Sequence, residues 1–253
     1  MQINNKVAMV TGAASGLGEA TARRLAREGA KVGVLDRDIV RAESVAKDIG
    51  GLALTCDVTD EKAVGSALAA LAEWHEIPSI VVNCAGIGQS EKVISGGKAL
   101  PFANHKKVID THLNGTFNVI RLAAEQMIKR MPDEQGQRGV FVNTSSISGI
   151  EGQIGAVSYA AAKAGIAGMT LPLAREFSRY GIRVVAIAPG LFETPMVGEL
   201  RQSEVDKMVA GVPFPHRFGR PEEYARLARD IIENPMLNGE IIRLDAAFRI
   251  GGL

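Results

Sequence analysis

The chain alternates short apolar runs with longer amphipathic stretches, and this alternation limits its fold more than any other feature. The runs are rich in β-branched residues and nearly continuous in apolar character, which is typical of strands buried on both faces of a parallel sheet. They are Val7 to Val10, Val32 to Leu35, Leu52 to Thr55, Ile80 to Val82, Val140 to Asn143, Val184 to Ile187 and Ile241 to Leu244. The pattern predicts an α/β fold, doubly wound around one seven-stranded parallel sheet.

The amphipathic stretches predict the helices that cover this sheet: Gly16 to Glu28, Ile39 to Lys47, Glu61 to Trp74, Lys106 to Arg130 and Tyr159 to Tyr180. Pro172 lies inside the last of them and has no N–H to donate, so we expect a kink or a break there. Glu91 to Asn104 lacks such periodicity and is predicted to be a surface excursion, while Met196 to Val212 is predicted to be a mobile lid. At 253 residues the chain suits a single domain over residues 1–253.

Charge and composition exclude several classes of function. The 29 Lys and Arg against 28 Asp and Glu give a formal charge of +1, and no basic run is long enough for a nucleic-acid surface. No apolar stretch approaches the roughly 18 residues that cross a bilayer, and Met1 to Lys6 lacks a signal-peptide pattern. We expect a soluble, cytoplasmic protein without nucleic-acid or membrane partners. Cys56 and Cys84 lie in apolar runs without CxxC spacing, so neither a disulfide nor a metal site is expected.

A glycine-rich turn follows the first strand and opens the first helix. Its residues are Thr11, Gly12, Ala13, Ala14, Ser15, Gly16, Leu17 and Gly18. Glycines let the backbone approach a pyrophosphate closely, and the start of a helix offers unpaired N–H groups to an anion. The turn therefore indicates a Rossmann-type dinucleotide site, although a flexible strand-to-helix connection would explain it equally well in isolation.

The ends of the next strands carry polar or small residues where the rest of a dinucleotide would lie. Asp36 comes eighteen residues after Gly18 and favours NAD over NADP, because its carboxylate accepts from ribose hydroxyls and repels a 2′-phosphate. Arg37 weakens this inference, since a guanidinium binds phosphate well. Asp57 is a candidate for the adenine amino group, with Val58 beside it. Asn83, Ala85 and Gly86 supply small residues against the sheet after the fourth strand. Each of these residues has an ordinary turn or strand-end role as its alternative.

Tyr159 and Lys163 are four residues apart, so on a helix they share one face. A phenol has a reference pKa of about 10. An ammonium held about 4 Å away would stabilise the phenolate by about 4 kcal/mol and lower that pKa into a useful range for a proton acceptor. Ser146 lies thirteen residues upstream and offers a hydroxyl to a substrate oxygen, with Ser145 and Ser148 as competitors. These three groups predict proton transfer from an alcohol next to the dinucleotide.

Together these motifs make the chain, over essentially its whole length, similar to the short-chain dehydrogenase/reductase family in its NAD-dependent form. The resemblance implies that Ser146, Tyr159, Lys163 and Asn114 form a catalytic group, in which the backbone carbonyl of Asn114 holds a proton-relaying water. It implies that Asn83-Cys84-Ala85-Gly86 is the NAG motif with Cys84 inserted. In the segment Pro189, Gly190, Leu191, Phe192, Glu193, Thr194, it implies that Thr194 contacts the nicotinamide.

A finer resemblance is to the type II 3-hydroxyacyl-CoA dehydrogenases within this family. It rests on four segments: Gly136 to Val140, Ile187 to Phe192, Val212 to Pro215, and Ile232 to Glu240. The sequence departs from the family at Asp245-Ala246-Ala247, where Asp-Gly is usual. The resemblance places Gln153 beside the substrate, and implies a homotetramer built through the helices at Lys106 to Arg130 and Tyr159 to Tyr180.

The activity expected from these observations is reversible, NAD-dependent oxidation of a secondary alcohol to a ketone, with 3-hydroxyacyl-CoA as the substrate class. Two alternatives use the same residues: an NADP-dependent 3-oxoacyl-carrier-protein reductase, and a steroid or general alcohol dehydrogenase. A third alternative belongs to another class of protein, a dinucleotide-binding sensor or scaffold without catalysis.

Overall fold

The computed structural model describes residues 1–88, 91–195 and 201–251. At its centre is a parallel seven-stranded sheet in the order β3-β2-β1-β4-β7-β8-β9. Its strands are β1 (Val7–Thr11), β2 (Lys31–Asp36), β3 (Leu52–Thr55), β4 (Ile80–Asn83), β7 (Gly139–Thr144), β8 (Ile182–Pro189) and β9 (Ile241–Leu244). The predicted α/β, doubly wound fold and all seven predicted strands are confirmed.

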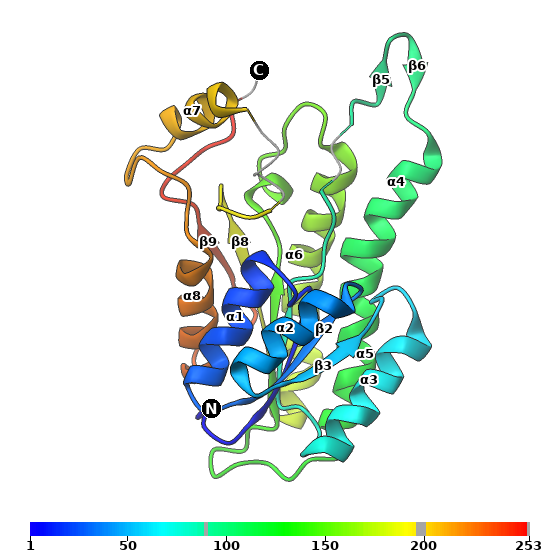
Figure 1. Cartoon of the computed structure of the whole chain (residues 1–253), viewed down its shortest axis with the longest axis vertical. Coiled ribbons are helices and arrows are strands. Elements are labelled where there is room, and N and C mark those ends of the chain that lie inside the picture. The colour runs from blue at the N-terminus through cyan, green and yellow to red at the C-terminus, as the bar shows by residue number, and fades with distance from the viewer. Residues whose placement is uncertain (89–90, 196–200, 252–253) are drawn as a thin grey trace.

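Helices cover both faces of this sheet, as Figure 1 shows. They are α1 (Gly16–Arg27), α2 (Ile39–Ile49), α3 (Glu61–Trp74), α4 (Phe102–Ile109), α5 (Gly115–Met127), α6 (Val157–Phe177), α7 (Gln202–Ala210) and α8 (Pro221–Glu233). The side chain of Asp60 accepts from the amides of Lys62 and Ala63 at the start of α3, which satisfies two N–H groups that the helix itself leaves unpaired.

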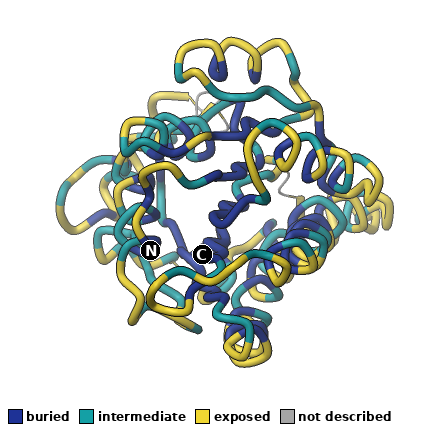
Figure 2. The backbone as a smooth tube through the Cα atoms, turned by 90° about the horizontal axis from the view of Figure 1, so that it is seen from below, coloured by how far each residue is buried: buried dark blue, intermediate teal, exposed yellow. Residues whose placement is uncertain are grey.

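The hydrophobic core has two halves, one on each face of the sheet. Alternate residues of β1 divide between them: Ala8 and Val10 pack with α1, α2 and α8, whereas Val7 and Met9 pack with α3, α5 and α6. The backbone view in Figure 2 shows the buried residues concentrated on the strands and on the helix surfaces that face them. This division explains why the strands are almost continuously apolar in sequence, since both sides of each strand lie under helices.

The structure differs from the sequence prediction at several helices. The stretch predicted as one helix over 106–130 consists of α4, a π-helical turn (Asp110–Asn114) and α5. α6 continues through Pro172 without a break, because this residue lies on the exposed face, where water can satisfy the carbonyl left without an N–H partner. Sequence analysis missed α8, although Pro221 at its first position and Glu222 and Glu223 in its first turn are typical start signals.

Two segments for which no regular element was predicted contain some: Glu91 to Asn104, predicted to be a surface excursion, and Met196 to Val212, predicted to be a mobile lid. A short antiparallel hairpin of β5 (Ile94–Ser95) and β6 (Lys98–Ala99) turns through two glycines with positive φ, Gly96 and Gly97, and projects from the body of the molecule (Figure 1). The predicted lid over 196–212 contains α7, while residues 196–200 lie outside the described part of the chain.

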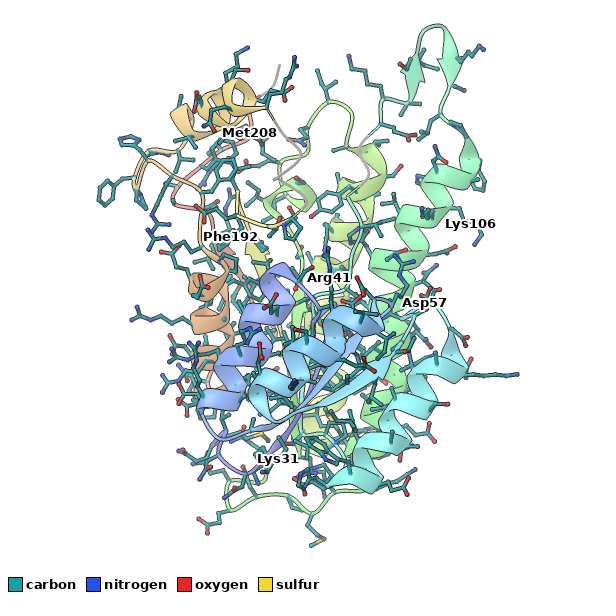
Figure 3. All side chains as sticks on the ribbon, viewed as in Figure 1. Lys31, Arg41, Asp57, Lys106, Phe192 and Met208 are labelled. Atoms are coloured by element: carbon teal, nitrogen blue, oxygen red, sulfur yellow. The ribbon has the colours of Figure 1, made fainter. Side chains whose placement is uncertain are left out.

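The carboxyl ends of the parallel strands all meet at one edge of the sheet. The chain reverses its direction of winding between β1 and β4, and ligands of open α/β sheets bind in the crevice at such a switch point. Figure 3 shows Phe192 and Met208 toward this edge and Lys31, at the start of β2, at the opposite end. The edge carries the predicted site residues, and the opposite end carries none of them.

Candidate active site

The glycine-rich turn brings backbone against backbone with no room for a side chain. A Cβ on Gly18 would lie 2.2 Å from the carbonyl oxygen of Gly12, and a Cβ on Gly12 would lie 2.8 Å from the backbone of Ala85. Gly12 and Gly16 both have positive φ, a conformation that glycine adopts readily. The structure thus contains a tight glycine cradle at the start of α1, which is the arrangement that a pyrophosphate requires. The residues present therefore fit a dinucleotide.

The carboxylate of Asp36 stabilises this turn by accepting hydrogen bonds from backbone amides. One of its carboxylate oxygens accepts from the amide of Ala14 at 3.1 Å, and the other accepts from the amide of Asp38 at 3.0 Å. The carboxylate therefore lies at the edge of the glycine turn, where the prediction placed it. The Arg37 guanidinium lies 3.9 Å from the carboxylate of Asp57 and forms an ion pair with it.

A small pocket extends from the glycine turn across the ends of β2, β3 and β4. The residues that line it are Gly12, Asp36, Arg37, Cys56, Asp57, Val58, Ala85, Gly86 and Thr111. Burial tends to raise the pKa of Asp57, but hydrogen bonds from the amide and hydroxyl of Thr59, together with Arg37, lower it overall. The pocket thus brings together six residues predicted for cofactor binding: Gly12, Asp36, Asp57, Val58, Ala85 and Gly86.

The turn after β4 is fixed by the strand beside it. The hydroxyl oxygen of Thr11 accepts from the amides of Cys84 and Ala85, each at 3.2 Å. The side-chain amide of Asn83 donates to the side-chain oxygen of Asn143 on the next strand at 2.9 Å. These bonds make the Asn83 to Gly86 segment a rigid wall of the site.

Ser146, Tyr159 and Lys163 meet at the carboxyl end of β7. The hydroxyls of Ser146 and Tyr159 share a hydrogen bond. The ammonium of Lys163 lies 5.5 Å from the centre of the Tyr159 ring and donates to the carbonyl of Thr144 at 2.7 Å. Ser145, a competitor for the serine position, instead donates its hydroxyl to the carbonyl of Lys163 at 2.9 Å. The three groups predicted for proton transfer therefore lie together.

The electrostatics of this group differ from the expectation. Burial raises the pKa of Tyr159, and the hydrogen bond from Ser146 opposes that rise only in part. Burial also lowers the pKa of Lys163 to about 8. The prediction that Lys163 brings the phenol pKa below its usual value is wrong for the protein by itself. The reason is that both groups are withdrawn from water, and desolvation penalises both charged forms.

Asn114 does not join these three side chains. It is exposed at the end of the π-helical turn, and its amide donates to the carboxylate of Asp110 at 2.9 Å. The side chain of this turn that reaches the group is His112, which is 2 % exposed and meets Tyr159 edge-on with ring centres 5.2 Å apart. A single His carries no motif that predicts a function, so His112 could not be chosen as a site residue from the sequence.

His112 lies under the turn after β4. Its Nε2 lies 3.0 Å from the carbonyl oxygen of Ile87, and a Cβ on Gly86 would lie 2.6 Å from the imidazole ring. Burial, and then the charge of Lys163, lower the pKa of His112 to about 3. The imidazole is therefore neutral at ordinary pH and supports both the turn and the phenol by packing.

A cavity of ≈ 750 Å³ opens above the Ser146–Tyr159 pair. Gln153, predicted to lie beside the substrate, lines it together with Ser148. Lys207 and Met208 of α7 form another part of its wall, as the predicted lid would. The remaining described lining residues are Ile87, Gly88, Ile147, Ile154, Gly190, Leu191, Gly211, Phe248, Arg249, Ile250 and Gly251.

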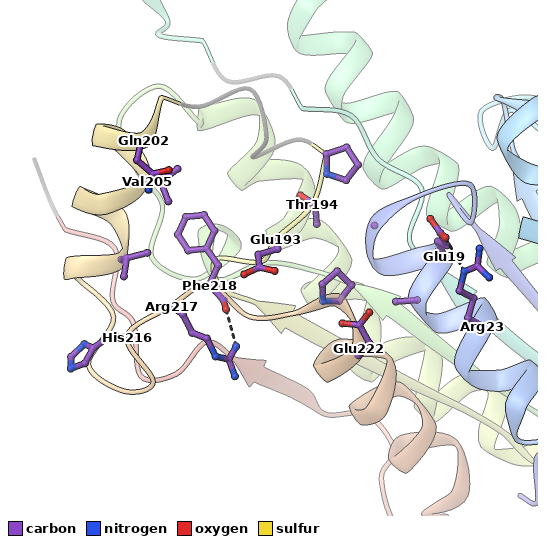
Figure 4. Close-up of a pocket in the computed structure, with 15 residues that line it drawn as sticks. Glu19, Arg23, Glu193, Thr194, Gln202, Val205, His216, Arg217, Phe218 and Glu222 are labelled. Atoms are coloured by element: carbon purple, nitrogen blue, oxygen red, sulfur yellow. Dashed lines mark hydrogen bonds and ion pairs between the residues drawn. The ribbon is translucent and has the colours of Figure 1, made fainter.

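The segment after β8 also borders a second, open cleft of ≈ 840 Å³ (Figure 4). Thr194 lines this second cleft and faces the start of α1, where Gly16 also lines it. Gly190 is held against the chain after β9, where a Cβ would lie 2.8 Å from Asp245. Gly190 and Leu191 thus lie at the substrate cavity, and Thr194 lies toward the glycine turn.

Neither a metal-binding cluster nor a membrane-spanning helix is found among the described residues. Across residues 1–88, 91–195 and 201–251, no three His, Cys, Asp or Glu side chains are grouped so as to hold a metal ion. Within the same ranges, no helix combines the length and the apolar character that a membrane span needs.

Comparison with known proteins gives consistent similarities. The short chain dehydrogenase family profile matches residues 6–205. The chain is 46 % identical to the human and the Drosophila melanogaster 3-hydroxyacyl-CoA dehydrogenase type-2, over 98 % of its own length and 97 % and 99 % of theirs. It is 34 % identical to a 3-oxoacyl-[acyl-carrier-protein] reductase of Thermotoga maritima, over 99 % of this chain and all of that one. A crystal structure of 3-hydroxyacyl-CoA dehydrogenase type-2 from Mycobacterium avium superposes with a TM-score of 0.93 at 39 % identity, covering 98 % of both chains.

Proposed function

The chain belongs to the short-chain dehydrogenase family, and from this premise we propose that it oxidises 3-hydroxyacyl-CoA to 3-oxoacyl-CoA reversibly with NAD. The observation that carries the proposal is the meeting of Ser146, Tyr159 and Lys163 beside a glycine cradle and under a large cavity. The relatives named as 3-hydroxyacyl-CoA dehydrogenases support the substrate class.

The dinucleotide would be held by the glycine turn, the small pocket beyond it, and Thr194. We assign its binding to Thr11, Gly12, Ser15, Gly16, Leu17, Gly18, Asp36, Asp57, Val58, Asn83, Ala85, Gly86, Tyr159, Lys163, Pro189, Gly190, Leu191 and Thr194. When bound, it supplies the acceptor for a hydride and a positively charged ring near the phenol.

The protein's own groups handle the proton. The deprotonated form of Tyr159 takes the proton of the substrate hydroxyl, since its side chain lines the cavity beside the Ser146 hydroxyl. Ser146 holds the substrate oxygen as negative charge develops on it. Lys163, fixed by the carbonyl of Thr144, binds the ribose, with its ammonium 5.5 Å from the centre of the Tyr159 ring. The part proposed for Asn114 belongs to its backbone carbonyl and not to its exposed side chain.

The choice of NAD over NADP rests on charge. The carboxylate of Asp36 lies at the end of β2, where it repels a phosphate, and the nearby Arg37 lies next to Asp57. Asp36→Asn keeps an oxygen acceptor and removes the negative charge. We expect it to lower the ratio of kcat/KM for NAD over NADP by about tenfold, the size of one charge interaction near the surface. Asp38→Asn is the matched control and leaves the ratio unchanged. An unchanged ratio in Asp36→Asn would contradict the assignment.

The substrate class is supported by the cavity as well as by the relatives. Apolar side chains such as Ile154, Leu191 and Met208 suit an acyl chain, while Lys207 brings positive charge for the phosphates of coenzyme A. Gln153 adds a polar group beside the apolar ones.

The test is a spectrophotometric assay of purified protein with 3-hydroxybutyryl-CoA and NAD. We expect turnover with this pair and much slower turnover with NADP. Faster reduction of 3-oxoacyl-carrier protein with NADPH would favour the reductase alternative, and faster oxidation of steroids or simple alcohols would favour a general alcohol dehydrogenase. Tight NAD binding without turnover on any of these substrates would favour a non-catalytic sensor.

We also propose a homotetramer. Two helices predicted to form its contacts carry exposed apolar side chains, Phe117 on α5 at 48 % and Leu171 on α6 at 44 % exposure. Light scattering should therefore give four times the chain mass of 26.8 kDa. A monomeric mass would contradict this proposal and leave the assigned chemistry unaffected.

A further inference from the structure

The chain after β9 turns back over the sheet edge and enters the substrate cavity. Phe248, Arg249, Ile250 and Gly251 line this cavity together with Ser146 and Tyr159. In Figure 1 the red chain that follows β9 runs up to α7, at the end of the molecule that carries the site. The tail is therefore a wall of the cavity and needs something to hold it there.

A network of four charged side chains holds this tail against the loop that follows Ser146. We call Glu151, Arg243, Asp245 and Arg249 the tail clasp. Glu151 lies 2.7 Å from the guanidinium of Arg243 and 3.4 Å from that of Arg249. Asp245 lies 2.6 Å from Arg243 and 3.1 Å from Arg249. Each acid thus contacts both bases, and the network joins residues almost a hundred positions apart.

Glu151 also contacts the tail backbone directly. Its second carboxylate oxygen accepts from the amide of Ile250 at 2.8 Å. This hydrogen bond, and then the charges of Arg243 and Arg249, lower the pKa of Glu151 and keep it ionised at neutral pH. The side chains of Glu151, Arg243 and Asp245 are 20 %, 25 % and 8 % exposed, so these three are better shielded from solvent than an ordinary surface ion pair, whereas Arg249 is 59 % exposed.

The turn that redirects the tail is strained. Ala246 and Ala247 have φ values of 52° and 59°, a conformation that is unfavourable for residues with a Cβ. The Asp245 carboxylate accepts from the amide of Ala247 at 3.1 Å, and the Asp245 carbonyl accepts from the amide of Phe248 at 2.8 Å. Such strain persists only where the surroundings determine the conformation, which is the part that the clasp plays here.

Phe248 is the one aromatic side chain that the described part of the tail contributes to the cavity. Its ring packs against the end of α7, where a Cβ on Gly211 would lie 2.9 Å from it. Met208 of α7 lines the cavity from the same side. The Phe248 ring thus forms the part of the cavity wall that lies beside the end of α7.

We propose that Phe248 sets the acyl chain length that this cavity accepts, and that Glu151 is a positioning residue that holds Phe248 in place through the tail clasp. This inference rests on the proposed function, because it takes the ligand of the cavity to be an acyl chain. Removing the ring enlarges the apolar cavity, so longer chains gain binding that short ones do not use. Loosening the clasp leaves the reacting groups intact and relaxes the limit that Phe248 sets on chain length.

The first experiment measures kcat/KM on 3-hydroxyacyl-CoA substrates from butyryl to dodecanoyl. Relative to the wild type, we expect Phe248→Ala to raise the ratio of longest to shortest substrate by about tenfold, since each added methylene that becomes buried contributes several-fold in binding. Phe248→Trp should lower the same ratio. Phe102→Ala, which removes an exposed ring outside the cavity, is the control and should leave it unchanged. An unchanged profile in both folded Phe248 variants would overturn the proposal.

The second experiment tests the clasp with Glu151→Gln. We expect KM for the longest substrates to fall several-fold while kcat stays within about twofold, because the limiting ring is released and the chemistry is untouched. Glu233→Gln, which removes a pair with Arg229 on α8, is the matched control and should change neither constant. A fall in kcat with no change in KM, in a folded variant, would contradict a positioning role.

Hydrogen exchange separates a failure of this inference from a failure of the proposed function. The amide of Ile250 should exchange slowly in the wild type and at least tenfold faster in Glu151→Gln, whatever the substrate is. If the wild type oxidises no 3-hydroxyacyl-CoA, the proposed function and the chain-length part fail together. Equal exchange in both proteins would show that the clasp does not hold the tail.

Discussion

The two halves of the ligand-binding edge are built in different ways. Around β1 and β4 the edge is made of backbone, and contacts such as Gly18 against the Gly12 carbonyl depend on the absence of side chains. Around β9 it is made of charged side chains and a strained turn, with Glu151 held to Arg243 across the cavity wall. The first half therefore tolerates no added atom, whereas single changes in the second half should alter binding without unfolding the protein.

The largest expected effect comes from breaking the backbone half. Gly18→Ala places a methyl group 2.2 Å from the Gly12 oxygen, so the turn must move. We expect a loss of about 3 kcal/mol in unfolding free energy, as in other cases of severe overpacking, together with loss of dinucleotide binding. Urea unfolding and calorimetric titration with NAD measure both quantities.

The matched control is Gly65→Ala in α3, where a Cβ meets nothing within 4 Å. It should raise stability by up to about 1 kcal/mol, since alanine favours a helix. If the two substitutions had equal effects, the close backbone contact at Gly18 would not be what matters.

The next largest effect is the dependence of stability on pH, which comes from the charge of Lys163. Lys163 is buried, and this burial lowers its pKa from the usual 10.5 to about 8. Between these pH values the unfolded chain binds more protons than the folded one, so folding becomes more favourable as pH rises from about 8 to about 10.5. Relative to Lys163→Met, the wild type should gain about 3 kcal/mol over that window. Chemical denaturation of both proteins across this pH range measures the gain, and parallel pH curves would contradict the lowered pKa.

A smaller effect tests the strain in the charged half. Ala246→Gly removes the penalty of a positive φ and should raise the unfolding free energy by about 1 kcal/mol. Ala161→Gly, at an exposed position inside α6, should instead lower it by about 0.5 to 1 kcal/mol. Thermal and urea denaturation report both changes. Destabilisation by both substitutions would mean that the turn after β9 is not strained.

The smallest effect comes from an ordinary surface pair. Arg121 lies 2.8 Å from Glu61, but these side chains are 40 % and 67 % exposed. Arg121→Gln should change stability by less than about 0.5 kcal/mol and should do so less at high salt. A change above 1 kcal/mol would remove the distinction between exposed pairs and the shielded tail clasp.

The sequence allowed the backbone half to be predicted almost completely. Strand ends, the glycine turn, Asp36 and the Ser146–Tyr159–Lys163 group follow from local patterns and spacing, and the structure brings them together as expected. Such features can be predicted from a sequence because a turn or a helix face is determined by residues a few positions apart.

The charged half could not be predicted because its partners are distant in the chain. Nothing near Glu151 in sequence points to Arg243 or Arg249, and α7 and α8 were missed although α8 has ordinary start signals. His112 was overlooked for a similar reason. Its position next to Tyr159 arises from the π-helical turn, which moves a residue that a regular helix would place elsewhere.

The central claim is that the deprotonated phenol oxygen of Tyr159 takes the proton of the substrate alcohol. Tyr159→Phe removes that single oxygen and keeps the ring that packs against His112. The measurement is kcat with 3-hydroxybutyryl-CoA and NAD, together with the Kd for NAD on the same protein. We expect kcat to fall by about 10³-fold while the Kd stays within about threefold of the wild-type value. A variant that retains kcat within about tenfold of the wild type would contradict the account.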